Sequence, residues 1–170
     1  MAADGRMRVL VMVDEGDSTS RVLQYLGRVA SGRGAVGIVL AHLAPGLSPA
    51  LLETGGAEQP EQEERIEADL RRQQRASISA AQRKSARLLE TARGKLVRAG
   101  VARSRVELRE SSPFDAGSAV EAVLALADEA DCGTIVVGHR AHGWLSGVAG
   151  GHLAERLVRE AAGRAVWVVD

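Results

Sequence analysis

Short apolar segments alternate with amphipathic segments along this chain. Five segments have the near-continuous or alternating apolar pattern of β-strands. These segments are Met7–Val13, Val36–Leu43, Arg105–Glu110, Thr134–Val137 and Ala165–Val169. Apolar residues at helical spacing follow the first four, and predict helices that begin near Thr19, Glu61, Ser118 and Leu153. Because crossovers between parallel strands are right-handed, this order predicts an α/β protein with a five-stranded parallel sheet and helices on both faces.

Two of the predicted helices have recognisable starts. Thr19 precedes the apolar face of the first helix and is of a residue type that caps helices, so we expect it to be the N-cap. Ser118 and Glu121 have the spacing of a capping box at the start of the third helix. The local sequence therefore predicts helix starts at Thr19 and Ser118.

The longest helical pattern covers residues 61–99. One helix of that length spans about 60 Å at 1.5 Å per residue, which is too long for one layer of a sheet. The polar stretch Arg71–Arg75 is therefore the expected break or overhang. Two prolines and three glycines between Gly46 and Pro60 predict a loop before it. We expect a single domain, residues 1–170, with an expanded insertion at about 46–78 in the second crossover.

Charge and composition exclude several classes of partner. The 22 lysines and arginines balance 22 aspartates and glutamates, whereas nucleic-acid-binding proteins usually carry a basic surplus. Aromatic residues are 2% of the chain, too few for a platform that stacks single-stranded bases. The longest mostly apolar stretch, residues 35–44, is about half as long as a membrane span. We therefore expect binding to neither nucleic acid nor membrane.

The N-terminus and the cysteine content indicate the compartment. Residues 1–8 lack the hydrophobic region of a signal peptide. A single cysteine, Cys132, cannot form an internal disulfide, which suits a reducing compartment. The sequence therefore predicts a cytoplasmic protein.

Two strand ends carry the candidate chemistry, because ligands of open α/β sheets bind beyond the carboxyl ends of the strands. Asp14 directly follows the first strand. The segment Gly138–His152 follows the fourth strand and contains five glycines in fifteen residues. Its backbone N–H groups and the helix start near Gly151 suit phosphate oxygens. Spacing alone leaves two interpretations open, a phosphate-binding loop and a flexible connection.

Several segments recur at the spacing of one known family. They are Val11–Asp14, Val39–Leu43, Gly117–Val123, Ile135–Arg140, Gly151 with Glu155, and Ala165–Val169. In these residues the chain resembles the universal stress protein family from about Arg8 to Asp170. The resemblance implies an adenine-nucleotide alpha-hydrolase-like, Rossmann-like sheet with strand order 3-2-1-4-5.

The resemblance also implies a set of nucleotide-binding residues. Asp14 would contact the adenine–ribose end, and the backbone from Ala41 to Leu43 would line the base. Gly138, Arg140 and Gly151 would surround the phosphates. The implied ligand is ATP, alone or with Mg²⁺.

The phosphate-binding pattern of that family is only partly present. Nucleotide-binding members carry Gly-x2-Gly-x9-Gly-Ser/Thr, whereas this chain has Ala141 and His152 at the second and fourth positions with the spacing intact. A β-carbon at a position of positive φ costs roughly 1 kcal/mol or more. Two functions therefore stay open: a stress-response protein that binds an adenine nucleotide as a regulatory signal or slow switch, and a nucleotide-free dimeric interaction module.

Partners are predicted at two places. The resemblance implies a homodimer through the last strand, Ala165–Val169, which places Trp167 partly between subunits. An edge strand favours such pairing because its backbone groups are open. The helical region 61–99 is the candidate surface for a protein partner.

Other reactive residues give no catalytic or metal site. No nucleophile, base and orienting group occur in a recognised motif, so we expect no dedicated catalytic activity and at most slow ATP hydrolysis. His139, His142 and His152 have no carboxylate or thiol beside them, which argues against metal. Cys132 and His42 lie in apolar surroundings and are predicted to be core residues. Asp14, Glu15 and Asp17 suit either Mg²⁺ beside a triphosphate or a helix start.

Overall fold

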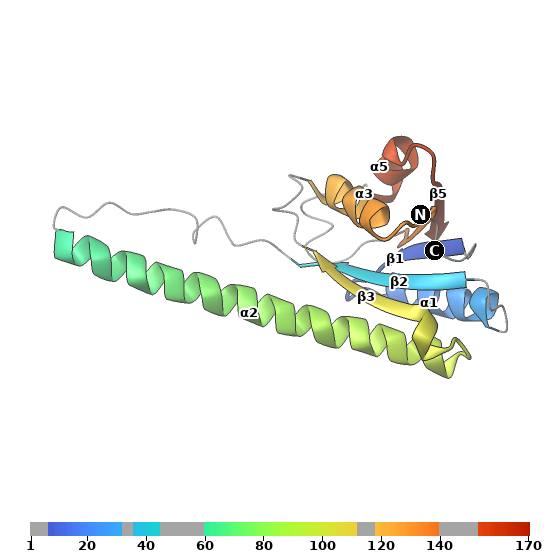
Figure 1. Cartoon of the computed structure of the whole chain (residues 1–170), viewed down its shortest axis with the longest axis horizontal. Helices are drawn as coiled ribbons and strands as arrows, with labels where there is room; N and C mark the ends of the chain where they lie inside the picture. Colours follow the sequence, from blue (N-terminus) through green and yellow to red (C-terminus); the bar gives the residue numbers. More distant parts are fainter. Residues whose placement is uncertain (1–6, 32–35, 45–59, 112–117, 140–152) are drawn as a thin grey trace.

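The protein contains one five-stranded parallel sheet with strand order β3-β2-β1-β4-β5 (Figure 1). The computed structural model describes residues 7–31, 36–44, 60–111, 118–139 and 153–170. The strands are β1 (Met7–Met12), β2 (Val36–Leu43), β3 (Val106–Ser111), β4 (Thr134–Gly138) and β5 (Ala165–Val169). Both the parallel sheet and the order that the resemblance implied are confirmed.

Burial follows the position of each strand in the sheet. In β1, Leu10 and Met12 point to one face, and Val9 and Val11 point to the other, so the central strand is buried on both sides. The edge strands β3 and β5 are only partly buried. This difference explains why the central strands read as continuous apolar runs, while the edge strand β3 alternates.

Helices cover both faces of the sheet (Figure 1). The helices α1 (Asp17–Ala30) and α2 (Pro60–Arg98) pack on one face. The helices α3 (Ala119–Glu129) and α5 (Leu153–Glu160) pack on the other. A 3₁₀ turn, η2 (Arg103–Arg105), leads into β3. Two apolar cores result, one on each side of the sheet.

The helix α2 is continuous over 39 residues, so the expectation of a break at Arg71–Arg75 is wrong and the overhang is the correct alternative. Figure 1 shows its N-terminal half projecting well past the sheet. Arginine and glutamine are good helix formers, so a polar stretch does not by itself end a helix. Arg71 pairs with Glu67, and Arg72 pairs with Asp69 at 3.3 Å, which adds local support.

The two predicted helix starts have different outcomes. Ser118 is the N-cap of α3, and its Oγ accepts a hydrogen bond from the Glu121 backbone N–H at 3.2 Å, as predicted. The N-cap of α1 is Gly16, and Thr19 lies one turn inside the helix, so its assignment as N-cap is wrong. The Thr19 hydroxyl is instead bonded to Asp14, outside the helix.

Several predicted connections lie outside the described residues. These are most of the turn at residues 31–34, the loop at 46–60 except Pro60, and the loop at 111–117 except Ser111. Pro60 itself is the first residue of α2, where the missing backbone N–H of proline costs nothing. Within the described part of the chain, no helix is long and apolar enough to cross a membrane.

Candidate functional site

The candidate site lies at the point where strand order reverses. The strand β1 pairs with β2 on one side and with β4 on the other, and consecutive crossovers leave from opposite faces there. Asp14 follows β1, and Gly138 is the last residue of β4. Both therefore lie at the carboxyl edge where ligands of open α/β sheets bind. The structure brings these two predicted residues to one edge.

Asp14 is held in place by the start of α1. Its Oδ1 accepts hydrogen bonds from the Gly16 backbone N–H at 2.9 Å and from the Thr19 hydroxyl at 2.5 Å. The Thr19 Oγ1 in turn accepts from the Asp14 backbone N–H at 2.9 Å. This reciprocal pair fixes both the backbone and the carboxylate of Asp14. A fixed carboxylate at a strand end is suited to accept hydrogen bonds from the hydroxyls of a ligand.

Gly138 is needed for a close approach between β4 and α1. A β-carbon at this position would lie 2.6 Å from both Cβ and Oγ of Ser18, which is buried. The next residue, His139, extends the pairing of β4 with β5 through its backbone N–H, which donates to the Val169 carbonyl at 2.8 Å. The glycine thus has a packing role, and the phosphate contact that the resemblance implied stays a prediction.

Ala41 and Leu43 lie near the carboxyl end of β2, next to β1. Ala41 is in register with Met12, and its carbonyl accepts a hydrogen bond from the Val13 N–H at 2.8 Å. Both side chains are fully buried in the core on the α3 and α5 side. The backbone from Ala41 to Leu43 therefore borders the same edge as Asp14, and its contact with a base stays a prediction.

The remaining predicted site residues are Arg140, Ala141, Gly151 and His152, and all four lie outside the described residues. The same holds for His142. In the described part of the chain, no group of three or more histidine, cysteine or acidic side chains is arranged to hold a metal ion. Of the acids after β1, Glu15 is paired with Lys84 at 3.0 Å, so it does not join Asp14.

His42 is a buried, hydrogen-bonded residue, as predicted. Its Nδ1 lies 3.0 Å from the Oγ of Ser85 on α2, and Ser85 is fully buried. Burial raises the pKa of Glu110 on β3 above its ordinary value, and the hydrogen-bonding contact with Ser85 opposes this shift. Burial lowers the pKa of His42, so the neutral imidazole predominates.

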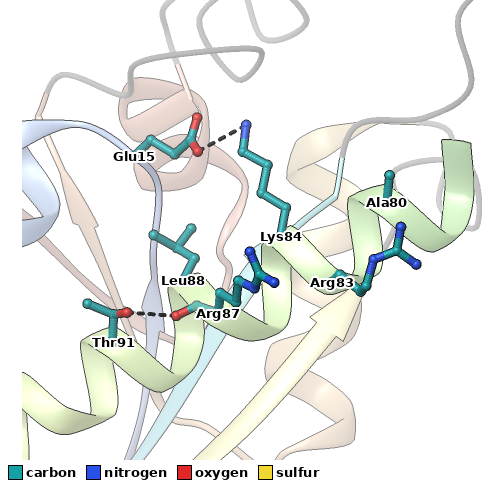
Figure 2. Close-up of a pocket in the computed structure, with 7 residues that line it drawn as sticks. All are labelled: Glu15, Ala80, Arg83, Lys84, Arg87, Leu88 and Thr91. Carbon is teal, nitrogen blue, oxygen red and sulfur yellow. Dashed lines mark hydrogen bonds and ion pairs between the residues drawn. The ribbon is translucent and has the colours of Figure 1, made fainter.

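The sequence reasoning missed a basic groove that α2 and Glu15 line (Figure 2). It has a volume of about 370 Å³ and lies between α2 and the turn from β1 to α1. Its lining residues are Glu15, Ala80, Arg83, Lys84, Arg87, Leu88 and Thr91. Cations one and four residues apart along a helix are visible in the sequence. Their position beside Glu15, far away in sequence, comes only from the fold.

The core prediction for Cys132 and the edge-strand prediction for Trp167 are confirmed. Cys132 is buried, and burial raises the pKa of its thiol, which argues against a reactive nucleophile. Trp167 lies in an edge strand and packs edge-to-face against Tyr25, with ring centroids 6.2 Å apart.

Comparisons with known proteins agree with this architecture. The model of the universal stress protein family matches residues 5–169. No curated protein matches the chain. A universal stress protein structure from Burkholderia pseudomallei shares 19% identity with a TM-score of 0.62, and the match covers 98% of this chain and 97% of that one.

Two similar solved structures contain nucleotides. A universal stress protein from Archaeoglobus fulgidus in complex with dAMP shares 20% identity with a TM-score of 0.54, covering 98% of this chain and all of that one. A universal stress protein in complex with cAMP shares 22% identity with a TM-score of 0.58, covering 98% and 99% of the two chains. At these identities the structures establish a shared fold, and their ligands are properties of those proteins. With the family match over nearly its whole length, the chain belongs to the universal stress protein family.

Proposed function

We propose that this protein binds an adenine nucleotide, ATP, at the switch point and uses it as a regulatory signal or slow switch in a stress response. The observation that carries the proposal is the meeting of Asp14, Gly138 and the end of β2 at one edge of the sheet. The dAMP and cAMP complexes of proteins with this fold support an adenine nucleotide as the class of ligand.

In the proposed complex, Asp14 accepts hydrogen bonds at the adenine–ribose end, and Gly16 and Thr19 hold its carboxylate in position. The backbone from Ala41 to Leu43 borders the base. The phosphates rest on the segment that begins at Gly138. Nucleotide occupancy at this segment then controls recognition by a partner.

Calorimetric titration of the whole protein with ATP and Mg²⁺ tests this proposal. We expect saturable binding, and Asp14→Asn should weaken it roughly tenfold or more, because a charge-assisted hydrogen bond is lost. The matched control is Asp17→Asn, an exposed acid in the first turn of α1, which should leave affinity within about twofold. Absence of both heat and thermal shift at millimolar ATP would exclude the nucleotide function.

A second function is favoured by the altered phosphate-binding pattern. With Ala141 and His152 in place of glycine and serine or threonine, the protein would be a nucleotide-free module that recruits partners through α2. Reverting Ala141→Gly and His152→Ser separates the two functions. Binding of ATP only after reversion supports the module, whereas ATP released from freshly purified wild-type protein at about one per subunit argues against it.

We further propose a homodimer through the edge strand β5. Its Val168 is 42% exposed, and Val158 on α5 is 60% exposed, whereas the central strands β1, β2 and β4 are mostly buried. Light scattering after size exclusion should give twice the chain mass. Val168→Lys should produce monomers, and Val97→Lys, an exposed valine on α2, should not. A wild-type monomer at micromolar concentration contradicts this assembly.

A further inference from the structure

The basic groove on α2 carries more positive than negative charge, although the whole chain is neutral. Its three cations are Arg83, Lys84 and Arg87, and its one acid is Glu15. Glu15 is paired with Lys84 at 3.0 Å, as Figure 2 shows. Two positive charges therefore remain uncompensated within the groove.

The carboxylate that lies nearest to Arg87 along the helix is used elsewhere. Glu90, three residues on, is bonded to Arg93 and lies 3.6 Å from Arg103. The guanidinium of Arg83 donates to the Ser79 hydroxyl at 3.2 Å, a neutral acceptor. Among the residues that the structure describes, neither Arg83 nor Arg87 has a carboxylate within ion-pair distance.

This arrangement has a cost in the absence of an anion. Arg83 and Arg87 are four residues apart, so they lie on the same side of α2 and repel one another. Both side chains are exposed, so they do not contribute to the core. The groove between them is about 370 Å³, which accommodates one phosphorylated group with part of its carrier.

We propose that this groove binds an oligophosphate group, either free or at the end of a nucleotide. Arginine presents a planar fork of donors that matches phosphate oxygens bidentately, and two such forks on successive helical turns suit a group with several anionic oxygens. The Lys84–Glu15 pair borders the group, and Leu88 forms the apolar wall. The site is separate from the proposed phosphate contact at Gly138 and does not depend on the nucleotide function.

Titration with inorganic pyrophosphate, followed by NMR of the backbone amides, tests the groove directly. We expect saturable shifts at residues 83–91, and an affinity that falls with added salt. Arg83→Gln and Arg87→Gln should each weaken binding roughly tenfold or more. The matched control is Arg75→Gln, an exposed arginine on the overhanging part of the same helix, which should leave affinity unchanged.

Further ligands distinguish the sources of the phosphate group. Adenosine tests the switch-point site alone, because it carries no phosphate, so its binding is independent of the groove. ADP that binds more tightly than pyrophosphate, and whose binding Arg87→Gln weakens, assigns the groove to a nucleotide tail. ADP that binds no more tightly than pyrophosphate assigns the groove to the oligophosphate itself. The proposal is overturned if pyrophosphate gives no saturable shifts at the groove, or if Arg75→Gln has the same effect as Arg87→Gln.

Discussion

The side chain of Ser18 occupies the space in which a side chain at Gly138 would begin. A β-carbon at Gly138 would lie 2.6 Å from Cβ and Oγ of Ser18, and real β-carbons do not approach other atoms so closely. Ser18 is in the first turn of α1 and is 3% exposed, so it has no room to move aside. The end of β4 and the start of α1 are therefore packed together at the candidate site.

This contact predicts that Gly138→Ala is destabilising. Overpacking of this kind typically costs about 1–3 kcal/mol, and urea unfolding should show that loss. Gly133→Ala is the matched control, because a β-carbon at Gly133 meets nothing within 4 Å. This variant should leave the free energy of unfolding nearly unchanged. Adding Ser18→Gly to Gly138→Ala should recover part of the loss. If it does not, the clash is not the cause.

A second prediction concerns the hydroxyl that holds Asp14. Thr19→Val keeps the shape of the side chain but removes one donor to the Asp14 carboxylate and one acceptor for its backbone N–H. We expect a loss of about 1–3 kcal/mol in the free energy of unfolding, because polar groups at a mostly buried site lose their partner. Affinity for ATP should fall in parallel.

The control for this prediction is Thr91→Val, an exposed threonine whose hydroxyl donates to the Arg87 carbonyl at 2.8 Å. That change should stay within about 0.5 kcal/mol. Equal losses at the two positions would show that the Asp14–Thr19 pair has no special part in stability.

A third prediction concerns pH. Burial lowers the pKa of His42 in the folded protein, with Glu15 and Asp14 opposing the shift and Lys84 adding to it. The unfolded chain therefore takes up the proton first as the pH falls through about 6.5, and folding stability decreases below that pH by at most about 1.4 kcal/mol per pH unit. The loss stops once the folded pKa is passed.

The variant His42→Asn isolates this effect. Asparagine can still hydrogen-bond to Ser85 but does not titrate. As the pH falls from about 7.5 to about 5.5, wild type should lose stability and the variant should not, so the advantage of wild type in free energy of unfolding should shrink. Glu110 acts in the opposite direction, because its raised pKa favours the folded state as pH falls toward 4.5. A difference that is independent of pH would contradict the assignment to His42.

A fourth prediction contrasts two helical glycines. Alanine normally stabilises a helix by about 0.5–1 kcal/mol over glycine, and Gly94→Ala in α2 should show this gain, since its β-carbon meets only the flexible end of Arg98 at 3.5 Å. Gly27→Ala in α1 should instead lower stability, because its β-carbon would lie 2.6 Å from the Ala99 Cβ. Thermal unfolding should give opposite signs. A gain at both positions would mean that α1 and α2 are not so closely packed.

Local sequence patterns predict some elements of this fold correctly and others wrongly. The central strands were recognisable because burial on both faces leaves a continuous apolar run, as in Val36–Leu43. Ser118 was recognisable as a cap because its partner is three residues away. The N-cap assignment of Thr19 is wrong because its hydroxyl donates to Asp14, which precedes the helix. The sequence alone does not distinguish a threonine at the N-cap from a threonine in the first turn that bonds to an earlier residue.

Some residues of the candidate site could likewise be predicted from the sequence, and others could not. Asp14 and Gly138 are identifiable because each ends a strand, and the family resemblance set the order of those strands. The basic groove and the His42–Ser85 bond were not identifiable, because their members come from elements far apart in the chain. Only the packing of α2 against the sheet brings them together.

By itself, the sequence determined the alternation of strands and helices, the parallel sheet and the family, because these depend on hydrophobic periodicity and short spacings. The tertiary structure decided that α2 is one uninterrupted helix, that Gly138 must lack a side chain, and that the cations of α2 gather beside Glu15. The reason is that steric contact and electrostatic compensation act between atoms that are close in space, whatever their separation along the chain.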